Sequence, residues 1–386
     1  MKVELNELGP IRRAELALGG LTVIVGPQAT GKSLFVQAVK LALDGDAIAT
    51  NNRKYGLTWQ EDRLHDFLTL VFGEGLGGLW TSRTSLTVDG VCHDVHAHLK
   101  PGRSRRKEAM FVVPAQRVLT MNRGWPRPFM DYSPGDPYVV RQFSESLRRL
   151  LEAGLGSEDG TLFPRENRLK RELRESFSAA ILRDAELAVD GSRLQKRTIL
   201  RLHGTDIPYM SWSAGQREFI PLLLSLFWLM PSSGATRRQG VECVAIEEPE
   251  MGLHPRAVAS VLLACLELVY RGYRVILTTH SPQILDLVWA LRSMRGSTDP
   301  AQHLFDLFDV PATTALRTLA RAVIEEREFH VSYFEPGPDG VVARDISSLD
   351  PGASEPSEAL WGGLTSFSAR ASEVVAACVN EKEESA

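Results

Sequence analysis

The chain has 386 residues, of which 44% are hydrophobic and 24% charged, and its formal net charge is −4 at pH 7. These values predict a globular protein of one large or two smaller domains, and they exclude a chain-wide positive field that attracts nucleic acid. The four cysteines, Cys92, Cys243, Cys265 and Cys378, form no C-x-x-C pair, and the N-terminus lacks the apolar core of a secretion signal. We therefore expect a soluble, cytoplasmic protein without a disulfide framework, a zinc site or a membrane contact.

Strands dominate the predicted elements of the first third of the chain. Strands are expected at residues 2–5, 14–18 and 21–25, a helix within 59–72, and a hairpin formed by 85–88 and 91–98 about Asp89-Gly90. A basic loop at 101–107 leads into a buried strand at 110–113. The Pro-, Gly- and aromatic-rich stretch 122–138 is expected to be an irregular loop.

The strand at 21–25 enters a phosphate-binding loop. The loop matches G-x-x-x-x-G-K-[S/T], precedes a helix-compatible run at 34–43, and consists of Gly26, Pro27, Gln28, Ala29, Thr30, Gly31, Lys32 and Ser33. Its glycines let backbone N–H groups turn toward phosphate oxygens at a helix N-terminus. Lys32 is expected to reach the β- and γ-phosphates and Ser33 to ligate Mg²⁺. The loop predicts binding of a nucleoside triphosphate.

Helices and strands alternate over the remainder of the chain. Helices are expected at 139–153, 164–187, 217–229, 258–270, 282–292, 313–328 and 366–379. Strands are expected as a hairpin over 198–210 and at 243–246, 274–278 and 331–334. Strands that alternate with helices around a phosphate-binding loop predict an α/β fold with a large insertion.

Two acids, Glu247 and Glu248, follow the apolar strand at 243–246. At such a strand end Glu247 is expected to contact the metal through its water shell, and Glu248 to orient the attacking water or accept its proton. A solvated acidic turn would give the same pattern. The phosphate-binding loop makes the catalytic interpretation the favoured one.

Two further motifs complete the predicted site. Ser213, Ala214, Gly215 and Gln216 open a helix and could bind an anion, although a simple serine N-cap would look the same. Because one subunit needs no second phosphate cradle, this segment is expected to hold a nucleotide bound to a second copy. His280 ends the strand at 274–278 and is expected to hydrogen-bond the γ-phosphate or the attacking water, a structural histidine being the alternative.

In this order the four motifs resemble those of an ATP-binding-cassette (ABC) ATPase head. The details are similar to its soluble branch, the SMC and RecF-like heads, and most similar to ATPases of the OLD (overcoming lysogenization defect) type. The resemblance rests on residues 9–14 with 21–27, on the Leu-His-Pro extension within 247–255, and on Thr-His-Ser-Pro at 279–282. It covers roughly residues 1–45, 110–120 and 198–290.

This resemblance implies an ABC-type P-loop NTPase head with a mixed central sheet, an N-terminal antiparallel β region and a helical insertion. Its parts would be residues 1–120 and 198–295 of the head, a mostly helical insertion at 121–197, and a C-terminal α/β extension at 296–386. It also implies ATP and Mg²⁺ as cofactors and hydrolysis of ATP. Two copies would sandwich two ATP molecules, each phosphate loop facing the Ser213 segment of the other copy.

The resemblance further implies a glutamine after a strand that senses Mg²⁺. Gln116 is the candidate, with Gln60 as the alternative. Arg12 or Arg13 is expected to contact the nucleotide, with a solvated surface pair as an equal alternative. The sequence does not distinguish between these two roles for either arginine.

Two departures from the family pattern bear on function. Residues 117–210 leave no room for a long coiled coil, and Asp345 and Asp350 are too few for the nuclease site of full-length OLD proteins. We therefore expect a stand-alone head that acts as a switch or motor for a partner effector, in bacterial antiphage defence or DNA metabolism. The alternatives are a RecF-like repair ATPase that binds duplex DNA through 165–174 and 103–107, a transporter subunit, which the Leu-His-Pro extension disfavours, and a non-hydrolytic nucleotide sensor.

Overall fold

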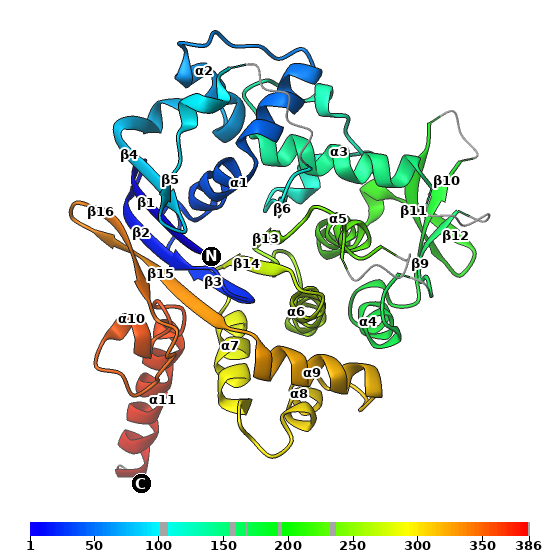
Figure 1. Ribbon diagram of the computed structural model, residues 1–386. Coiled ribbons are helices and arrows are strands. Elements are labelled where there is room, and N and C mark those ends of the chain that lie inside the picture. Colours follow the sequence, from blue (N-terminus) through cyan, green and yellow to red (C-terminus); the bar gives the residue numbers. More distant parts are fainter. Residues whose placement is uncertain (101–106, 155–159, 167, 192–194, 232–236, 385–386) are drawn as a thin grey trace.

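The computed structural model describes residues 1–386 except 101–106, 155–159, 167, 192–194, 232–236 and 385–386 (Figure 1). A ten-stranded sheet runs through it in the order β5-β4-β1-β2-β16-β15-β3-β14-β13-β6. Its strands are β1 (Lys2–Leu8), β2 (Ile11–Ala17), β3 (Leu21–Val25), β4 (Trp80–Val88), β5 (Val91–Cys92), β6 (Met110–Val113), β13 (Cys243–Glu247), β14 (Arg274–Thr279), β15 (Phe329–Gly337) and β16 (Gly340–Asp345). The predicted α/β class with a mixed central sheet is confirmed.

The sheet has a parallel half and an antiparallel half. β15, β3, β14, β13 and β6 are parallel, whereas β5, β4, β1 and β2 form the antiparallel region expected near the N-terminus. β16 pairs antiparallel with β15 and parallel with β2, so it joins the two halves. The segment expected as a C-terminal extension therefore contributes two strands to the middle of the sheet.

The strands β3, β13 and β6 of the parallel half are buried along their whole length, which explains why they are mainly apolar. Successive residues point to opposite faces: Val23 and Val25 of β3 lie in one core, and Ile24 lies in the other. The helices that cover the two faces are α1 (Lys32–Lys54) and α2 (Leu64–Phe72) on one side, and α5 (Ala214–Leu229), α6 (Pro255–Tyr270), α7 (Pro282–Met294), α8 (Pro300–Phe308) and α9 (Thr314–Glu326) on the other. The phosphate-binding loop and the Ser213 segment thus open helices on opposite faces.

The predicted insertion contains strands as well as helices. The helix expected at 164–187 is wrong: among the described residues of this stretch only α4 (Arg171–Phe177) and a single π-turn (Ser178–Leu182) are helical, and the chain then reverses at Arg183 and Asp184, both with positive φ. A second sheet is formed by β9 (Thr161–Phe163), which precedes α4, and by β10 (Glu186–Asp190), β11 (Arg197–Leu202) and β12 (Thr205–Pro208), which follow it. The predicted helix at 139–153 is confirmed as α3 (Tyr138–Glu152), and the expected irregular stretch carries the short ribbon of β7 (Met121–Asn122) and β8 (Trp125–Pro126).

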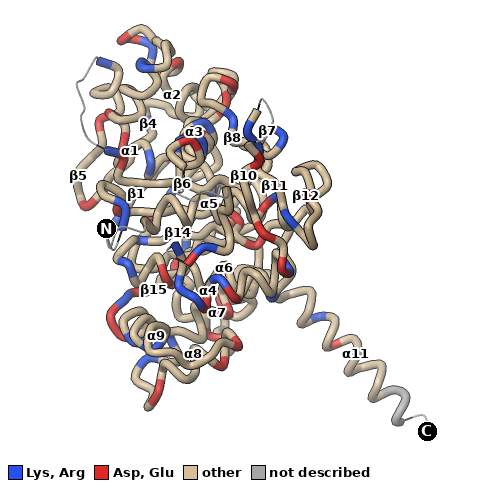
Figure 2. Tube along the Cα trace, turned by 90° about the vertical axis from the view of Figure 1, so that its right-hand side faces the viewer, with Lys and Arg blue, Asp and Glu red and all other residues tan. Residues whose placement is uncertain are grey.

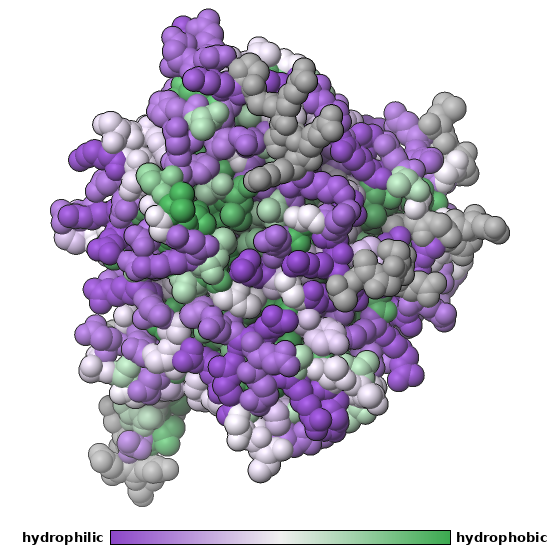
Figure 3. All heavy atoms as spheres, in the orientation of Figure 1, coloured by the Kyte–Doolittle hydropathy of each residue, from purple (hydrophilic) through white to green (hydrophobic). Residues whose placement is uncertain are grey.

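The C-terminal helix α11 (Ser366–Glu384) follows the short α10 (Pro356–Ala359) and projects from the body as an arm (Figure 2). The face of the molecule in Figure 3 is covered mainly by hydrophilic residues, as a water-exposed surface requires. No helix among the described residues is long and apolar enough to cross a membrane.

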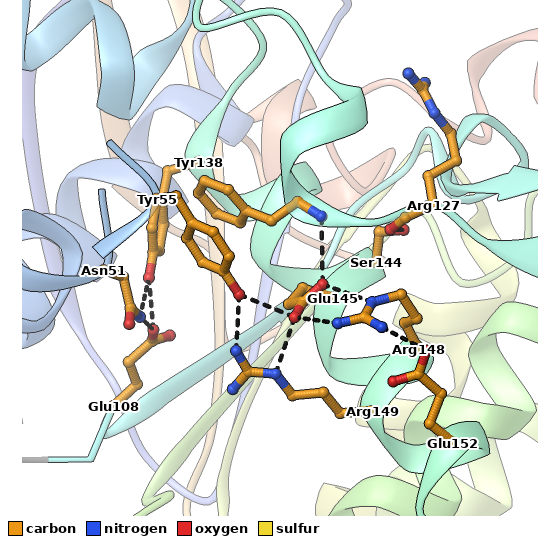
Figure 4. A network of polar contacts seen from close by, with 11 residues as sticks. Asn51, Tyr55, Glu108, Arg127, Tyr138, Ser144, Glu145, Arg148, Arg149 and Glu152 are labelled. Atoms are coloured by element: carbon orange, nitrogen blue, oxygen red, sulfur yellow. Dashed lines mark hydrogen bonds and ion pairs between the residues drawn. The ribbon is translucent and has the colours of Figure 1, made fainter. Parts of the chain in front are cut away.

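One buried carboxylate joins α1 to α3 (Figure 4). Glu145 of α3 accepts hydrogen bonds from Tyr55 Oη at the end of α1 (2.9 Å), from Arg148 and Arg149, and from the Phe129 backbone N–H. Burial opposes its ionisation, but these donors outweigh burial and lower the pKa of Glu145 to about 2. The network fixes the helical part of the insertion against the helix that follows the phosphate-binding loop.

Glu145→Gln is expected to lower the free energy of unfolding by about 2 kcal/mol at pH 7, because charge-assisted hydrogen bonds are lost. The folded pKa of Glu145 lies below its ordinary value of 4.5, so the wild-type advantage is complete above that value and disappears as pH falls toward 2. Urea unfolding at pH 7 and at pH 3 measures this difference. Glu152→Gln, at an exposed carboxylate of the same helix, is the control and should cost little. A difference that stays constant between the two pH values would contradict the assignment.

Candidate nucleotide site

Four neighbouring parallel strands end at one edge of the sheet, and a predicted motif follows each of them. The phosphate-binding loop follows β3, His280 follows β14, Glu248 follows β13, and Gln116 lies three residues after β6. The strand register aligns these ends: Thr279 pairs with Val25, Glu247 with Thr278, and Ile246 with Val113. Ligands of parallel α/β sheets bind beyond the carboxyl ends of the strands. The fold therefore brings these motifs to one place.

The phosphate-binding loop is shaped by close backbone packing. Gly31 has φ 87° and precedes α1, and a Cβ at this position would lie 2.8 Å from Ile11 Cγ1. A Cβ at Gly26 would lie 2.8 Å from the carbonyl oxygen of Phe334 in β15. Pro27, Gln28 and Ala29 are exposed at the tip of the loop, whereas Thr30 is buried and donates its hydroxyl to Pro27 O at 2.8 Å. Both glycines are required by the neighbouring strands β2 and β15.

Lys32 is folded back onto its own loop. Its Nζ donates to the carbonyl oxygens of Gly26 and Pro27, each at 2.8 Å. Burial lowers the pKa of Lys32, while the nearby carboxylates of Glu248, Glu247 and Glu250 act in the opposite direction. The lysine thus lies in the electrostatic field of three carboxylates.

Glu247 and Ser33 have the chemistry of a magnesium site. Glu247 is only 5% exposed, its Oε2 accepts from the Ala115 N–H at 3.4 Å, and its Oε1 is buried without a hydrogen-bond partner. Burial raises the pKa of Glu247, and the nearby Ser33 hydroxyl opposes this rise. Because a buried, unpartnered carboxylate oxygen calls for a cation or its water, these residues fit Mg²⁺. Among the described residues no group of three or more His, Cys, Asp or Glu side chains forms a metal site by itself.

Glu248 and His280 face each other beside this pair. His280 Nε2 lies 3.9 Å from Glu248 Oε1, and both side chains are about one-third exposed. Burial and the charge of Lys32 lower the pKa of His280, so the imidazole is neutral at pH 7. The Glu248 backbone has φ 45° and donates its N–H to Thr278 O at 2.9 Å. The two side chains can reach a common water molecule.

Glu250 is a site residue to which the sequence analysis assigned no role. Its Oε1 accepts from the Thr279 hydroxyl at 2.7 Å and from the His280 backbone N–H at 2.8 Å. It therefore fixes the turn that presents His280. The sequence feature that points to Glu250 as a site residue is its position in Glu-Glu-Pro-Glu, just after the buried strand.

The Ser213 segment forms a complete capping box at the start of α5. Ser213 Oγ accepts from the Gln216 N–H at 3.2 Å, and Gln216 Oε1 accepts from the Ser213 N–H at 3.0 Å. Ser213 and Ala214 are exposed. A Cβ at Gly215 would lie 2.8 Å from Gly252 O, so the helix packs tightly on the turn after the acidic pair. Within one chain Ser213 therefore acts as a helix N-cap. The start of the helix is exposed, and its role toward a second copy stays a prediction.

The remaining predicted residues have different environments. Gln116 is exposed at the carboxyl edge of the sheet, as a magnesium sensor requires, and its role stays a prediction. Gln60 lies between α1 and α2 and follows no strand. Arg12 pairs with Asp339 at 2.8 Å and Arg13 with Glu15 at 3.0 Å, which favours the surface-pair interpretation for both arginines.

Comparison with known proteins gives one family match. Residues 135–286 match the family described as "AAA domain, putative AbiEii toxin, Type IV TA system". This segment includes Ser213, Glu247, Glu248 and His280 but not the phosphate-binding loop. No curated protein matches the sequence.

Many solved structures match the fold, and three of them are described here. The SMC head bound to the C-terminal winged-helix domain of ScpA is 10% identical with TM-score 0.42, covering 89% of this chain and 96% of that one. The SMC head domain from Thermotoga maritima is 11% identical with TM-score 0.39, covering 89% and 97%. A bacterial Atm1-family ABC exporter with ATP bound is 14% identical with TM-score 0.34, covering 74% of this chain and 36% of that one. The family match thus spans the motifs from Ser213 to His280. The geometry of the whole site, with the phosphate-binding loop that lies outside this match, suits a nucleoside triphosphate.

Proposed function

We propose that the protein is an ATP-binding and ATP-hydrolysing ABC-type ATPase that closes head to head around two ATP molecules. The observation that carries this proposal is the shared edge at which Lys32, Ser33, Glu247, Glu248 and His280 meet. A lysine, a hydroxyl, a buried acid and an acid–imidazole pair that is about one-third exposed are the groups that phosphoryl transfer to water needs.

The residues take separate roles in this reaction. The loop N–H groups and Lys32 hold the phosphates, and Ser33, Glu247 and Gln116 would hold Mg²⁺, which when bound neutralises charge on the phosphate oxygens. Glu248 orients the attacking water and accepts its proton, and the neutral His280 hydrogen-bonds the same water or the γ-phosphate. The residues Ser213, Ala214, Gly215 and Gln216 hold the nucleotide of the second copy.

A switch of this kind acts through a partner. The exposed start of α5 is available to a second copy, which supports a head of the OLD, SMC and RecF-like branch. We expect this head to be cytosolic and to drive a separate effector protein in antiphage defence or DNA metabolism. The free cysteines are consistent with a reducing compartment. A transporter subunit remains disfavoured by the Leu253-His254-Pro255 sequence.

The purified protein tests the proposal directly. Release of phosphate from ATP should require Mg²⁺, and light scattering should show a larger species with a slowly hydrolysed ATP analogue than with ADP. Binding without turnover would instead support a nucleotide sensor. No nucleotide binding would overturn the proposal.

A second candidate function is direct binding of nucleic acid, through a surface other than the basic runs expected from the sequence. Part of the basic run at 165–174 is used internally: Lys170 pairs with Glu267 at 2.6 Å, and Arg174 donates to the carbonyl oxygens of Arg165 and Glu166. Residue 167 of this run and residues 101–106 of the other basic loop lie outside the described residues. Lys170 and Arg174 of the expected basic face are therefore already engaged within the chain.

A cleft elsewhere is a better candidate. It has a volume of about 1360 Å³, lies between the β7–β8 ribbon and the β11–β12 hairpin, and is lined by Arg123, Arg127, Lys196, Arg197, Trp125 and Met210, among others. Arg197 pairs with Asp190 at 3.1 Å, but within the described part of the chain Arg123 and Lys196 form no ion pair. Cations beside the partly buried Trp125 ring suit single-stranded nucleic acid.

Arg123→Glu combined with Lys196→Glu should abolish binding of a labelled oligothymidine in fluorescence anisotropy, because two phosphate contacts become repulsive. The logarithm of the wild-type binding constant should fall linearly with the logarithm of the salt concentration. Arg370→Glu, on the projecting arm, is the matched charge control. Wild-type binding that survives the double change would remove the cleft from consideration.

A further inference from the structure

A buried arginine that the sequence analysis passed over contacts two parts of the nucleotide site. Arg117 lies in a short 3₁₀ turn after β6 (Arg117–Thr120) and is 1% exposed. A guanidinium in such a place must be satisfied by several partners at once. Burial lowers the pKa of Arg117, and four surrounding carboxylates oppose that shift.

One side of the guanidinium holds the backbone of the acidic pair. Arg117 Nη1 donates to Glu247 O at 2.7 Å, and Nη2 donates to Glu248 O at 3.0 Å. Glu248 has a positive φ, a conformation that non-glycine residues adopt only when their surroundings impose it. The planar fork of Arg117 is therefore one of the groups that set the direction of the Glu248 carboxylate.

The other side of the guanidinium faces α5. Arg117 Nε lies 3.6 Å from Glu218 Oε2, and both atoms are buried without a hydrogen-bond partner. This separation exceeds an N–H···O hydrogen bond by roughly half an ångström. Glu218 follows Ser213 by little more than one helical turn. A small shift of the start of α5 would thus close or open this contact.

Backbone packing provides a second connection between the same two parts. A Cβ at Gly215 would lie 2.8 Å from Gly252 O, and one at Gly252 would lie 3.2 Å from Glu218 Cγ. The turn after Glu250 is consequently seated on the first turns of α5. Because this packing is tight, movement of the first turns of α5 would also shift the turn at Gly252, which follows Glu248 and Glu250.

We infer that Arg117 and Glu218 form a relay that connects the Ser213 end of α5 to the Glu248 carboxylate of the same subunit. Under the proposed function, on which this inference rests, docking of the second copy's nucleotide at Ser213 draws the Glu218 carboxylate onto Arg117 Nε. Arg117, which already donates to the carbonyl oxygens of Glu247 and Glu248, then fixes them in the hydrolytic arrangement. Each subunit would hydrolyse its own ATP only after engaging that of the other. Arg117 and Glu218 are positioning residues that touch no substrate.

Glu218→Gln is the sharper test, because this carboxylate has no hydrogen bond to lose and burial already raises its pKa. Turnover at saturating ATP should fall roughly 10- to 100-fold, the effect of misplacing a catalytic group by about an ångström. The melting temperature, ATP affinity and ATP-dependent dimer formation should stay at wild-type values. Dimer formation is measured in the Glu248→Gln background, where ATP persists.

Arg117→Lys is the second variant, since it keeps the charge but loses the fork and should reduce turnover in the same way. Glu242→Gln, at an exposed acid just before β13, is the control. Wild-type turnover in Glu218→Gln would overturn the relay, and so would a parallel loss of stability and dimer formation. Failure of the proposed function is distinguishable, because the wild-type protein itself would then lack ATP hydrolysis or dimer formation.

Discussion

Glu248→Gln is expected to lower the turnover number for ATP by roughly 100-fold or more, the range for loss of a general base. The amide keeps the size of the side chain but cannot accept the proton of the attacking water. ATP binding should persist, because Lys32 and the loop N–H groups are unchanged. The bound ATP should therefore hold two copies together. Size-exclusion chromatography with light scattering should show a stable dimer in ATP and a monomer in ADP.

Glu242→Gln serves as the matched control for this prediction. Glu242 precedes the same strand, β13, at its opposite end, and its side chain is 61% exposed. It should hydrolyse ATP and form only the transient dimer of the wild type. A Glu248→Gln protein that stays monomeric in ATP, or that turns over normally, would contradict the assignment of Glu248.

The sequence predicts the parallel half of the fold well because the local signals there agree. The strand predicted at 21–25 matches β3, and those at 110–113 and 243–246 match β6 and all but the last residue of β13. Each is a continuous apolar run buried on both faces, and polar motif residues follow directly. The site motifs could be placed together from sequence because parallel strands that end in such motifs share one edge.

Elements whose structure depends on distant partners were predicted less well. The stretch 164–187 has apolar residues at helical spacing, but Leu187 pairs with Phe163 and Leu200 in the second sheet. The reversal before it is made by Arg183 and Asp184 at positive φ, without a glycine or proline to announce it. Tertiary pairing here overrides the local pattern.

Other omissions had a readable signal. The β15–β16 hairpin turns at Pro338-Asp339-Gly340, and α8 begins with Asp299 as N-cap and Pro300 at its first position. Arg117 had none, because a charged residue beside a glutamine at a strand end does not reveal that it is 1% exposed. Its role follows only from the distances to the Glu247 and Glu248 carbonyl oxygens.

Lys32→Ala is expected to weaken ATP binding by roughly 100-fold, or about 3 kcal/mol, because a charge-assisted contact to the phosphates is lost. The loss should be large here since Glu247, Glu248 and Glu250 surround the lysine and would repel the triphosphate once the cation is gone.

The measurement is a titration with a fluorescent ATP analogue, together with the rise in melting temperature that ATP causes, which should vanish in the variant. Lys54→Ala, at the exposed last turn of the same helix, is the matched control and should bind ATP as the wild type does. The acids also predict the direction of the salt effect. Added salt screens their repulsion, so it should recover part of the affinity of Lys32→Ala. A Lys32→Ala protein with wild-type affinity would show that the phosphates are held elsewhere.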